Sequence, residues 1–311
     1  MEVRRLGDSG LKVSETGLGC NNFGMRIGQD AAQIVVDAAI EAGITLFDTA
    51  DMYGQGQSET MLGKALGARR QSVVVATKFG QPMGDAAHRQ GASRRWIMQA
   101  VDESLARLGT DYIDLYQIHF PDPATPIDET LRALEDVVKA GKVRYIGNSN
   151  FTGWMIADAD WTARDQRLTR FVSAQNGYSL LDRKAEQEVL PACTRFGLGF
   201  LPYFPLASGL LTGKYKRGEP PAQDTRMAAW GERAARALND QNFDKVEALS
   251  AYAEARGRTL LDLAFAWLLG HPQVSSVIAG ATRAEQIGGN VKASTWRLTS
   301  QEMTEIDALA A

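Results

Sequence analysis

The chain has 311 residues, of which 44% are hydrophobic and 23% charged, so it is long enough to bury a large core. Its net charge of −3 is not gathered into a basic patch, which argues against a nucleic-acid-binding surface. Cys20 and Cys193 lie far apart, no apolar run has membrane-spanning length, and three histidines with two separate cysteines do not suit a zinc cage. We therefore expect a cytoplasmic protein with no metal, membrane or nucleic-acid partner.

Strand and helix patterns alternate along the chain. Residues 3–13, with Asp-Ser-Gly in the middle, are typical of a β-hairpin. Runs rich in β-branched and aromatic residues then predict eight strands, at 15–19, 45–49, 73–77, 113–118, 143–148, 171–174, 200–204 and 275–279. Apolar residues at helical spacing predict helices at 57–66, 96–108, 126–138, 183–196 and 259–269.

The strand spacing favours a (β/α)8 TIM barrel formed by a single domain, residues 1–311. Most strand ends are roughly 30 residues apart, the size of one strand–helix unit. The last spacing is much longer, and we expect it to hold a long loop at 206–240 and an extra helix at 244–256. Eight such units predict a closed parallel sheet, with the hairpin covering its N-terminal end. The alternative is an open doubly wound sheet, but the glycines at 17–24 lack the spacing typical of that fold.

Three predicted strands end at or beside a titratable side chain. These are Asp48, Lys78 and His119, and Tyr53 follows Asp48 by five residues. Because barrel strands open their carboxyl ends on one face, the four side chains can converge there. Such a set is typical of a proton-transfer site. Taken singly, each has a structural alternative: an ion pair for Asp48 with Lys78, and core packing for Tyr53 or His119.

The motifs around these residues resemble those of the aldo-keto reductase family. They read DTADMYG at 48–54 with Glu59 beyond, ATK at 76–78 and YQIH at 116–119. Further motifs follow in order: GNSNF at 147–151, AQNGYSLL at 174–181, YFPLASGLLTGKY at 203–215 and VIAGAT at 277–282. The resemblance covers nearly the whole chain and is to bacterial-type members related to potassium-channel β-subunits. It implies a TIM barrel that reduces aldehydes or ketones with NADP(H).

The same resemblance implies a role for each of the four residues. Tyr53 would donate a proton to the carbonyl oxygen as hydride reaches the carbon. A free tyrosine has a pKa of about 10, so we expect the Lys78 ammonium to lower the pKa of Tyr53. Asp48 would pair with Lys78, and His119 would hydrogen-bond the substrate oxygen or share the proton of Tyr53.

The family pattern also implies which residues bind the cofactor. Ser149, Asn150 and Gln175 would hydrogen-bond the nicotinamide carboxamide, and Tyr203 would stack on the nicotinamide ring. The full set of expected residues is Gly19, Cys20, Asn21, Ser149, Asn150, Gln175, Tyr203, Phe204, Leu206, Ser208, Gly209, Leu210, Lys214, Arg226, Gly280, Thr282, Arg283, Gln286 and Asn290.

Cations are expected at the phosphates of the cofactor. Lys214 and Arg226 would neutralise the pyrophosphate, and Arg283 is the candidate for the 2′-phosphate, which favours NADPH over NADH. The chain departs from the family pattern twice. Phe204 stands where many relatives have serine, so only its backbone could contribute, and Gly289 stands where relatives often have a glutamate that binds adenine.

Aromatic and apolar residues in the predicted loops are candidates for the substrate wall, and the 206–240 loop is the candidate lid. Aromatic and apolar side chains of this kind suit aldehydes, ketones or quinone-like carbonyls as substrates. Two alternatives share the barrel: an NADP(H)-binding regulatory or redox-sensing subunit with little turnover, and a barrel enzyme of other chemistry such as an isomerase. The candidate wall residues are Phe23, Met25, Met83, Phe120, Trp154 and Trp230.

Overall fold

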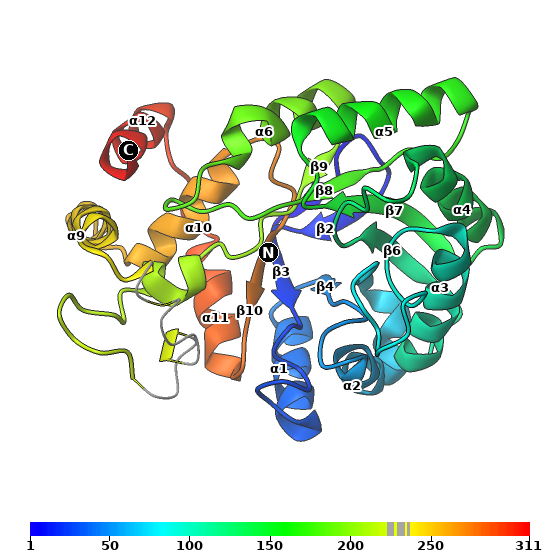
Figure 1. Ribbon diagram of the computed structural model, residues 1–311. Coiled ribbons are helices and arrows are strands. Elements are labelled where there is room, and N and C mark those ends of the chain that lie inside the picture. The colour runs from blue at the N-terminus through cyan, green and yellow to red at the C-terminus, as the bar shows by residue number, and fades with distance from the viewer. Residues whose placement is uncertain (223–226, 229–233, 235–236) are drawn as a thin grey trace.

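The architecture is a curled sheet of parallel strands surrounded by helices (Figure 1). It comes from a computed structural model of residues 1–311, which describes every residue except 223–226, 229–233 and 235–236. The strands lie side by side in the order β10, β3, β4, β5, β6, β7, β8, β9. Their bounds are β3 Thr16–Gly19, β4 Leu46–Asp48, β5 Val74–Phe79, β6 Ile113–Ile118, β7 Val143–Ser149, β8 Ser173–Gln175, β9 Gly199–Phe200 and β10 Val277–Gly280.

Backbone hydrogen bonds close the sheet into a barrel. The last strand, β10, pairs in parallel with the first, β3. On its other side, the N–H of Phe200 donates to the carbonyl of Gln273 (2.8 Å), and the N–H of Ser275 donates to the carbonyl of Phe200 (2.9 Å). The N–H of Ile278 continues this seam by donating to the carbonyl of Pro202 (3.1 Å). The predicted TIM barrel is therefore confirmed, and the open-sheet alternative is wrong.

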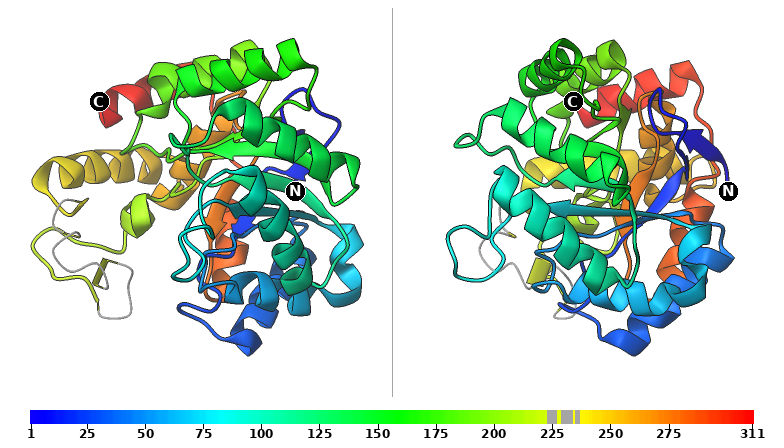
Figure 2. Two further views of the ribbon diagram at one scale, coloured as in Figure 1. Left: turned by 45° about the vertical axis from the view of Figure 1, so that its right-hand side comes forward. Right: turned by 90° about the vertical axis from the view of Figure 1, so that its right-hand side faces the viewer.

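Helices cover the outside of the sheet (Figure 2). Several begin at a capping side chain, such as Thr259, whose hydroxyl and backbone exchange hydrogen bonds with Asp262. Among the described residues, no helix is long and apolar enough to cross a membrane. The helix bounds are α1 Gln29–Glu41, α2 Gln57–Leu66, α3 Arg94–Leu108, α4 Ile127–Lys139, α5 Gly153–Gln166, α6 Ala185–Phe196, α9 Asp240–Glu254, α10 Leu260–Gly270, α11 Ala284–Ala293 and α12 Ser300–Ala310, with 3-10 turns η1 Gly67–Ser72 and η2 Ala207–Thr212.

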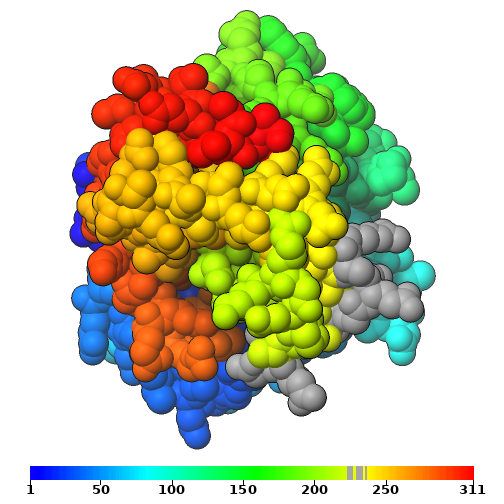
Figure 3. All heavy atoms as spheres, turned by 90° about the vertical axis from the view of Figure 1, so that its left-hand side faces the viewer, coloured from blue at the N-terminus to red at the C-terminus, as the bar shows by residue number. Residues whose placement is uncertain are grey.

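Two elements differ from their predicted bounds by four residues at one end, more than any of the other predicted elements. β9 ends at Phe200 rather than at residue 204, because Pro202 has no N–H to continue a ladder and Phe204 adopts a φ of 53°. The extra helix before α10, which is α9, begins at Asp240 rather than at residue 244. It lies beside α12 and the segment around η2 on one face of the molecule (Figure 3).

The N-terminal hairpin covers one end of the barrel, as predicted. Its strands are β1 (Val3–Arg5) and β2 (Lys12–Ser14), and they pair antiparallel. Leu6 and Val13 are fully buried in a small cluster with residues from the strands of the barrel. The other members of this cluster are Leu46, Val74, Ala76, Leu115, Leu201 and Ile278.

Candidate active site

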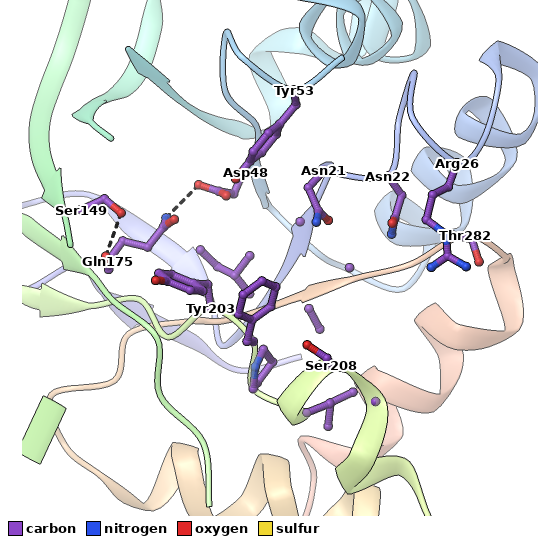
Figure 4. A pocket seen from close by; sticks show the side chains of 18 of the residues that line it. Asn21, Asn22, Arg26, Asp48, Tyr53, Ser149, Gln175, Tyr203, Ser208 and Thr282 are labelled. Carbon is purple, nitrogen blue, oxygen red and sulfur yellow. Dashed lines mark hydrogen bonds between the residues drawn. The ribbon is translucent and has the colours of Figure 1, made fainter. Parts of the chain in front are cut away.

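A cavity of about 410 Å³ lies at the carboxyl ends of the strands. Its wall takes residues from the ends of β3, β4, β7, β8 and β10, from the loop after β6, and from the segment around η2 (Figure 4). The catalytic candidates Asp48, Tyr53 and His119 are part of this wall. This volume falls within the range typical of small-molecule sites.

An ion pair between Asp48 and Lys78 forms the base of the site. Lys78 lies in β5, whose residues are all buried, and its Nζ donates to Oδ2 of Asp48 (2.7 Å) and to the carbonyl of Thr49 (2.8 Å). Oδ1 of Asp48 accepts from Nε2 of Gln175 (2.9 Å) and from Nε2 of Gln117 (3.4 Å). Burial alone would lower the pKa of Lys78, but the charge of Asp48 and its hydrogen bond raise it, so the lysine stays an ammonium.

Tyr53 lies close to both Lys78 and His119. Its ring centre is 5.3 Å from Nζ of Lys78, and it meets the His119 ring edge-on at a centroid distance of 5.8 Å. Burial raises the pKa of Tyr53 above its ordinary value, and Lys78 opposes that shift without reversing it. The expectation that the pKa of Tyr53 is lowered is therefore wrong for the protein alone, because burial disfavours tyrosinate more than the ammonium favours it.

His119 is held in the neutral state. Its backbone N–H donates to the carbonyl of Phe79 (2.9 Å), which continues the β5–β6 pairing by one residue. Burial, together with the charge of Lys78, lowers the pKa of His119 to about 3. A neutral imidazole keeps one N–H, so His119 can donate a hydrogen bond at neutral pH without adding charge.

A connected set of hydrogen bonds orients the wall beside Tyr203. The hydroxyl of Tyr203 donates to Oδ1 of Asn150 (2.7 Å). Nδ2 of Asn150 donates to the carbonyl of His119 (2.9 Å) and to Oγ of Ser149 (3.1 Å). Oγ of Ser149 donates to the carbonyl of Gln175 (2.8 Å; Figure 4). The ring of Tyr203 is thus fixed relative to the catalytic residues.

The segment after β9 has a backbone that few side chains tolerate. Phe204, Ala207 and Ser208 have φ values of 53°, 45° and 58°, and Gly209 has a φ of 99°. Left-handed conformations of non-glycine residues cost about 1–3 kcal/mol each and persist where the surroundings impose them. A Cβ on Gly209 would come within 3.1 Å of Nζ of Lys214, so this lysine lies directly over the turn.

The end of the cavity beyond β10 is formed by two loops. Nδ2 of Asn22 donates to the carbonyl of Ala281 (3.2 Å) and ties the loop after β3 to the loop after β10. In the second loop, Oε1 of Gln286 accepts from the backbone N–H of Thr282 (2.8 Å). Arg26, from the first loop, and Thr282, from the second, both line the cavity (Figure 4).

Most of the expected cofactor-binding residues lie on the cavity wall. Cys20, Leu210 and Asn290 are instead buried, Arg283 is exposed outside the wall, and Arg226 lies outside the described residues. The expected residues on the wall are Gly19, Asn21, Ser149, Asn150, Gln175, Tyr203, Phe204, Leu206, Ser208, Gly209, Lys214, Gly280, Thr282 and Gln286. The wall also contains residues that the sequence analysis did not single out, namely Asn22, Arg26, Met52, Pro205, Thr212, Ile278 and Ala279.

Only one of the expected substrate residues lies on the described wall. Phe120 lines the cavity and stacks on His119 at a centroid distance of 5.2 Å. Phe23 and Met83 are buried in the core, where their apolar side chains anchor the loops that were expected to display them. The remaining candidates do not contribute to this wall: Met25 and Trp154 are exposed outside it, and Trp230 lies outside the described residues, as does part of the expected lid.

Comparison with known proteins identifies the family. Residues 15–311 match the model of the Aldo/keto reductase family. The chain therefore belongs to this family, as its motifs indicated, and is an oxidoreductase of the TIM-barrel type.

Individual relatives are similar over nearly their full length. The chain is 40% identical to a probable voltage-gated potassium channel subunit beta of Oryza sativa subsp. japonica, over 94% of this chain and 91% of the relative. It is 35% identical to versiconal hemiacetal acetate reductase of Aspergillus parasiticus, over 99% and 96%. It is 33% identical to L-glyceraldehyde 3-phosphate reductase of Escherichia coli (strain K12), over 99% and 92%.

Proposed function

We propose that this chain is an NADP(H)-dependent reductase of aldehydes and ketones, with Tyr53 as the general acid. The observation that carries the proposal is the set of four side chains at one end of the cavity. Lys78 is fully buried, is paired with Asp48 and lies against the ring of Tyr53, and neutral His119 contacts the same ring edge-on. The family and the two reductases among the relatives support the same reaction class.

The residues on the wall fit a nicotinamide dinucleotide. Nε2 of Gln175 donates to Asp48, so Oε1 of Gln175 remains to accept a hydrogen bond from the nicotinamide carboxamide. Oγ of Ser149 can accept from the same carboxamide. Tyr203 offers a fixed aromatic face on the same wall as Gln175, Ser149 and the η2 segment. Lys214 supplies positive charge over the turn at Gly209, where a pyrophosphate would be neutralised.

The reaction follows from the protonation states of the site. When bound, the reduced nicotinamide supplies the hydride. The raised pKa of Tyr53 keeps its proton in place before substrate arrives, and the Lys78 ammonium stabilises the tyrosinate that forms as the proton leaves. His119 donates its N–H to the carbonyl oxygen as negative charge grows there. Phe120, stacked on His119, is an apolar boundary for the carbonyl compound.

The test is Tyr53→Phe, assayed by NADPH consumption with a panel of activated aldehydes and small ketones. A positioned general acid contributes about 10²–10⁴ in rate, so we expect kcat to fall by that factor. The affinity for NADPH, measured by titration of the protein alone, should change little. Turnover that survives the substitution would contradict the role of Tyr53.

A regulatory function is the second candidate, and the similarity to the rice potassium channel subunit favours it. It predicts tight binding of NADPH by the wild type with negligible turnover on every carbonyl in the panel. The same assay therefore separates the two functions, because only a reductase consumes NADPH in a reaction that depends on Tyr53.

A further inference from the structure

A row of polar residues crosses the interior of the barrel beside the catalytic ion pair. Gln117 in β6 is the register partner of Lys78 in β5 and, on its other side, of Gly147 in β7. Gly147 in turn pairs with Ser173 in β8. Because paired residues of neighbouring strands face the same side of a sheet, Gln117 and Ser173 point into the barrel, as Lys78 does. Branched apolar side chains usually fill such an interior, so this polar row is not explained by packing.

The row is incompletely hydrogen-bonded. Gln117 and Ser173 have no exposed surface, and neither Oε1 of Gln117 nor Oγ of Ser173 has a hydrogen-bond partner among the described residues. A Cβ on Gly147 would come within 2.2 Å of Oγ of Ser173 and 3.2 Å of Cγ of Gln117, so both side chains pack over this glycine. A buried polar group without a partner costs stability, and a leucine at position 117 would avoid that cost. The N–H side of the Gln117 amide is therefore where its role lies.

That N–H side faces the catalytic carboxylate. Nε2 of Gln117 donates to Oδ1 of Asp48 at 3.4 Å. The same oxygen accepts from Nε2 of Gln175 at 2.9 Å (Figure 4), and Oδ2 accepts from Nζ of Lys78 at 2.7 Å. The Gln117 contact is the longer and weaker of the two amide contacts. Gln175 lines the cavity, whereas Gln117 lies outside its described wall, so a ligand in the cavity does not contact the second amide.

The charge of Asp48 acts on the proton of Tyr53. Burial is the largest cause of the raised pKa of Tyr53, and among the charges near it Lys78 lowers the pKa while Asp48 raises it. A carboxylate that accepts N–H groups has part of its charge compensated by their dipoles. Each amide that donates to Asp48 therefore weakens the effect of this carboxylate on Tyr53.

The other titratable groups near the ion pair do not change charge at neutral pH. Burial raises the pKa of the carboxyl, thiol and hydroxyl groups among them and lowers the pKa of the imidazole, so all are neutral. The balance of charge at the ion pair consequently acts on the proton of Tyr53. The neutral groups, each of which interacts electrostatically with Lys78, are Asp51, Cys20, Tyr203 and His119.

We propose that Gln117 is a positioning residue of the active site, whose amide shares the charge of Asp48 and so favours proton release by Tyr53. The inference rests on the proposed function. Gln117 acts through Asp48, because it is buried behind the carboxylate and lies outside the cavity wall. With the amide in place, the carboxylate neutralises the Lys78 ammonium less fully, and the ammonium acts more strongly on the tyrosine hydroxyl.

The experiment compares Gln117→Met, which keeps the side-chain volume but not the amide, with the wild type. We expect kcat for carbonyl reduction to fall by about 3–10-fold, because the general acid is weaker. In alcohol oxidation with NADP+, where ionised Tyr53 accepts the proton, the rate should rise with pH at a value about 0.5–1 pH unit higher than in the wild type. The affinity for NADPH, titrated without substrate, should stay within about twofold.

A second variant, Gln117→Glu, separates hydrogen bonding from packing. Two neighbouring carboxyl groups share one proton, so the glutamate donates an O–H to Asp48 while protonated and becomes a second carboxylate once ionised. We expect its kcat to approach that of the wild type near pH 6 and to fall below that of Gln117→Met as pH rises. Gln71→Met, at an exposed position in η1, is the matched control and should behave as the wild type.

The remaining outcomes contradict the proposal in distinguishable ways. A kcat and a pH profile of Gln117→Met equal to those of the wild type would exclude any effect on Tyr53. A lower kcat in both variants, with the pH profile of the wild type, would show that Gln117 only packs the barrel. If Gln117→Met does not fold, the pH dependence of Gln117→Glu decides alone. Absence of turnover in the wild type would refute the proposed function and this inference together, whereas the other outcomes leave the reductase intact.

Discussion

Asp51 is a buried acid directly beside the catalytic residues. It has no exposed surface, and neither carboxyl oxygen has a hydrogen-bond partner among the described residues. Burial and the charge of Glu59 raise its pKa well above the ordinary value, against the smaller opposing effects of the Met52 backbone and Arg107. The folded protein therefore carries Asp51 as a neutral acid under conditions in which the unfolded chain has released that proton.

This state makes the free energy of unfolding depend on pH. Above about pH 4 the unfolded chain loses a proton that the folded state keeps, so Asp51 lowers stability as pH rises, by up to about 1.4 kcal/mol per pH unit. Asp51→Asn lacks this dependence. We expect the stability of the variant relative to the wild type to increase between pH 5 and 8 in urea unfolding. Asp158→Asn, at an exposed position in α5, is the control, and parallel pH profiles for all three proteins would contradict the idea.

The sequence predicted the parts of the site that have local signals. Asp48, Lys78 and His119 each follow an apolar run, and the strand pattern alone indicates that they share one face. Arg26 has no such signal, because its position depends on the bond from Asn22 to Ala281, a contact between distant parts of the chain. The raised pKa of Tyr53 was missed for a similar reason, since burial by the folded chain is not a property of the motif.

At the scale of elements, the close approach of α2 and α3 depends on one glycine. Gly63 lies within α2, and a Cβ there would come within 2.3 Å of the carbonyl oxygen of Leu108, in α3. Contact with backbone cannot be relieved by a rotamer change. Glycine is therefore required here for packing, although it is a poor helix former.

The prediction is that Gly63→Ala destabilises the protein. Alanine would add about 0.5–1 kcal/mol of helix stability, but overpacking typically costs about 1–3 kcal/mol, so the net change should be a loss of up to about 2.5 kcal/mol. Gly288→Ala is the matched control, because Gly288 lies within α11 with nothing near its missing Cβ and should gain stability. Thermal unfolding checks both. A rise in Tm for Gly63→Ala equal to that of Gly288→Ala would show that the helices can separate without penalty.

The order of elements was predictable to the extent that each has its own periodicity. The strand at 113–118 and the helix at 57–66 have the bounds that the pattern indicated. Helices α1, α5, α11 and α12 were given no predicted bounds, and α5 in particular has charged and aromatic residues on its exposed face, which weakens the helical stripe. The shortening of β9 depends on Pro202 and on the turn at Phe204, which tertiary contacts impose.

At the scale of the whole molecule, the barrel is stabilised at one end and reactive at the other. The N-terminal hairpin buries Leu6 and Val13 against the first residues of β4 and β5, Leu46 and Val74. A Cβ on Gly7 would come within 2.4 Å of the carbonyl oxygen of Gly197, just before β9, so the hairpin lies directly against the strands. The cavity opens at their opposite ends. Stability and cofactor binding should therefore respond separately to changes in the hairpin.

Leu6→Ala tests this separation. Removing a fully buried leucine side chain typically costs about 2–5 kcal/mol, so we expect the free energy of unfolding in urea to fall by that amount. The affinity for NADPH should stay within about twofold of the wild type, because Leu6 does not line the cavity and, among the described residues, its cluster shares only Ile278 with the cavity wall. Val3→Ala, at a position that is 55% exposed in the same hairpin, should change stability by less than about 0.5 kcal/mol. If Leu6→Ala costs no more than Val3→Ala, the hairpin does not stabilise the barrel. If it also weakens NADPH binding more than twofold, the two ends are coupled.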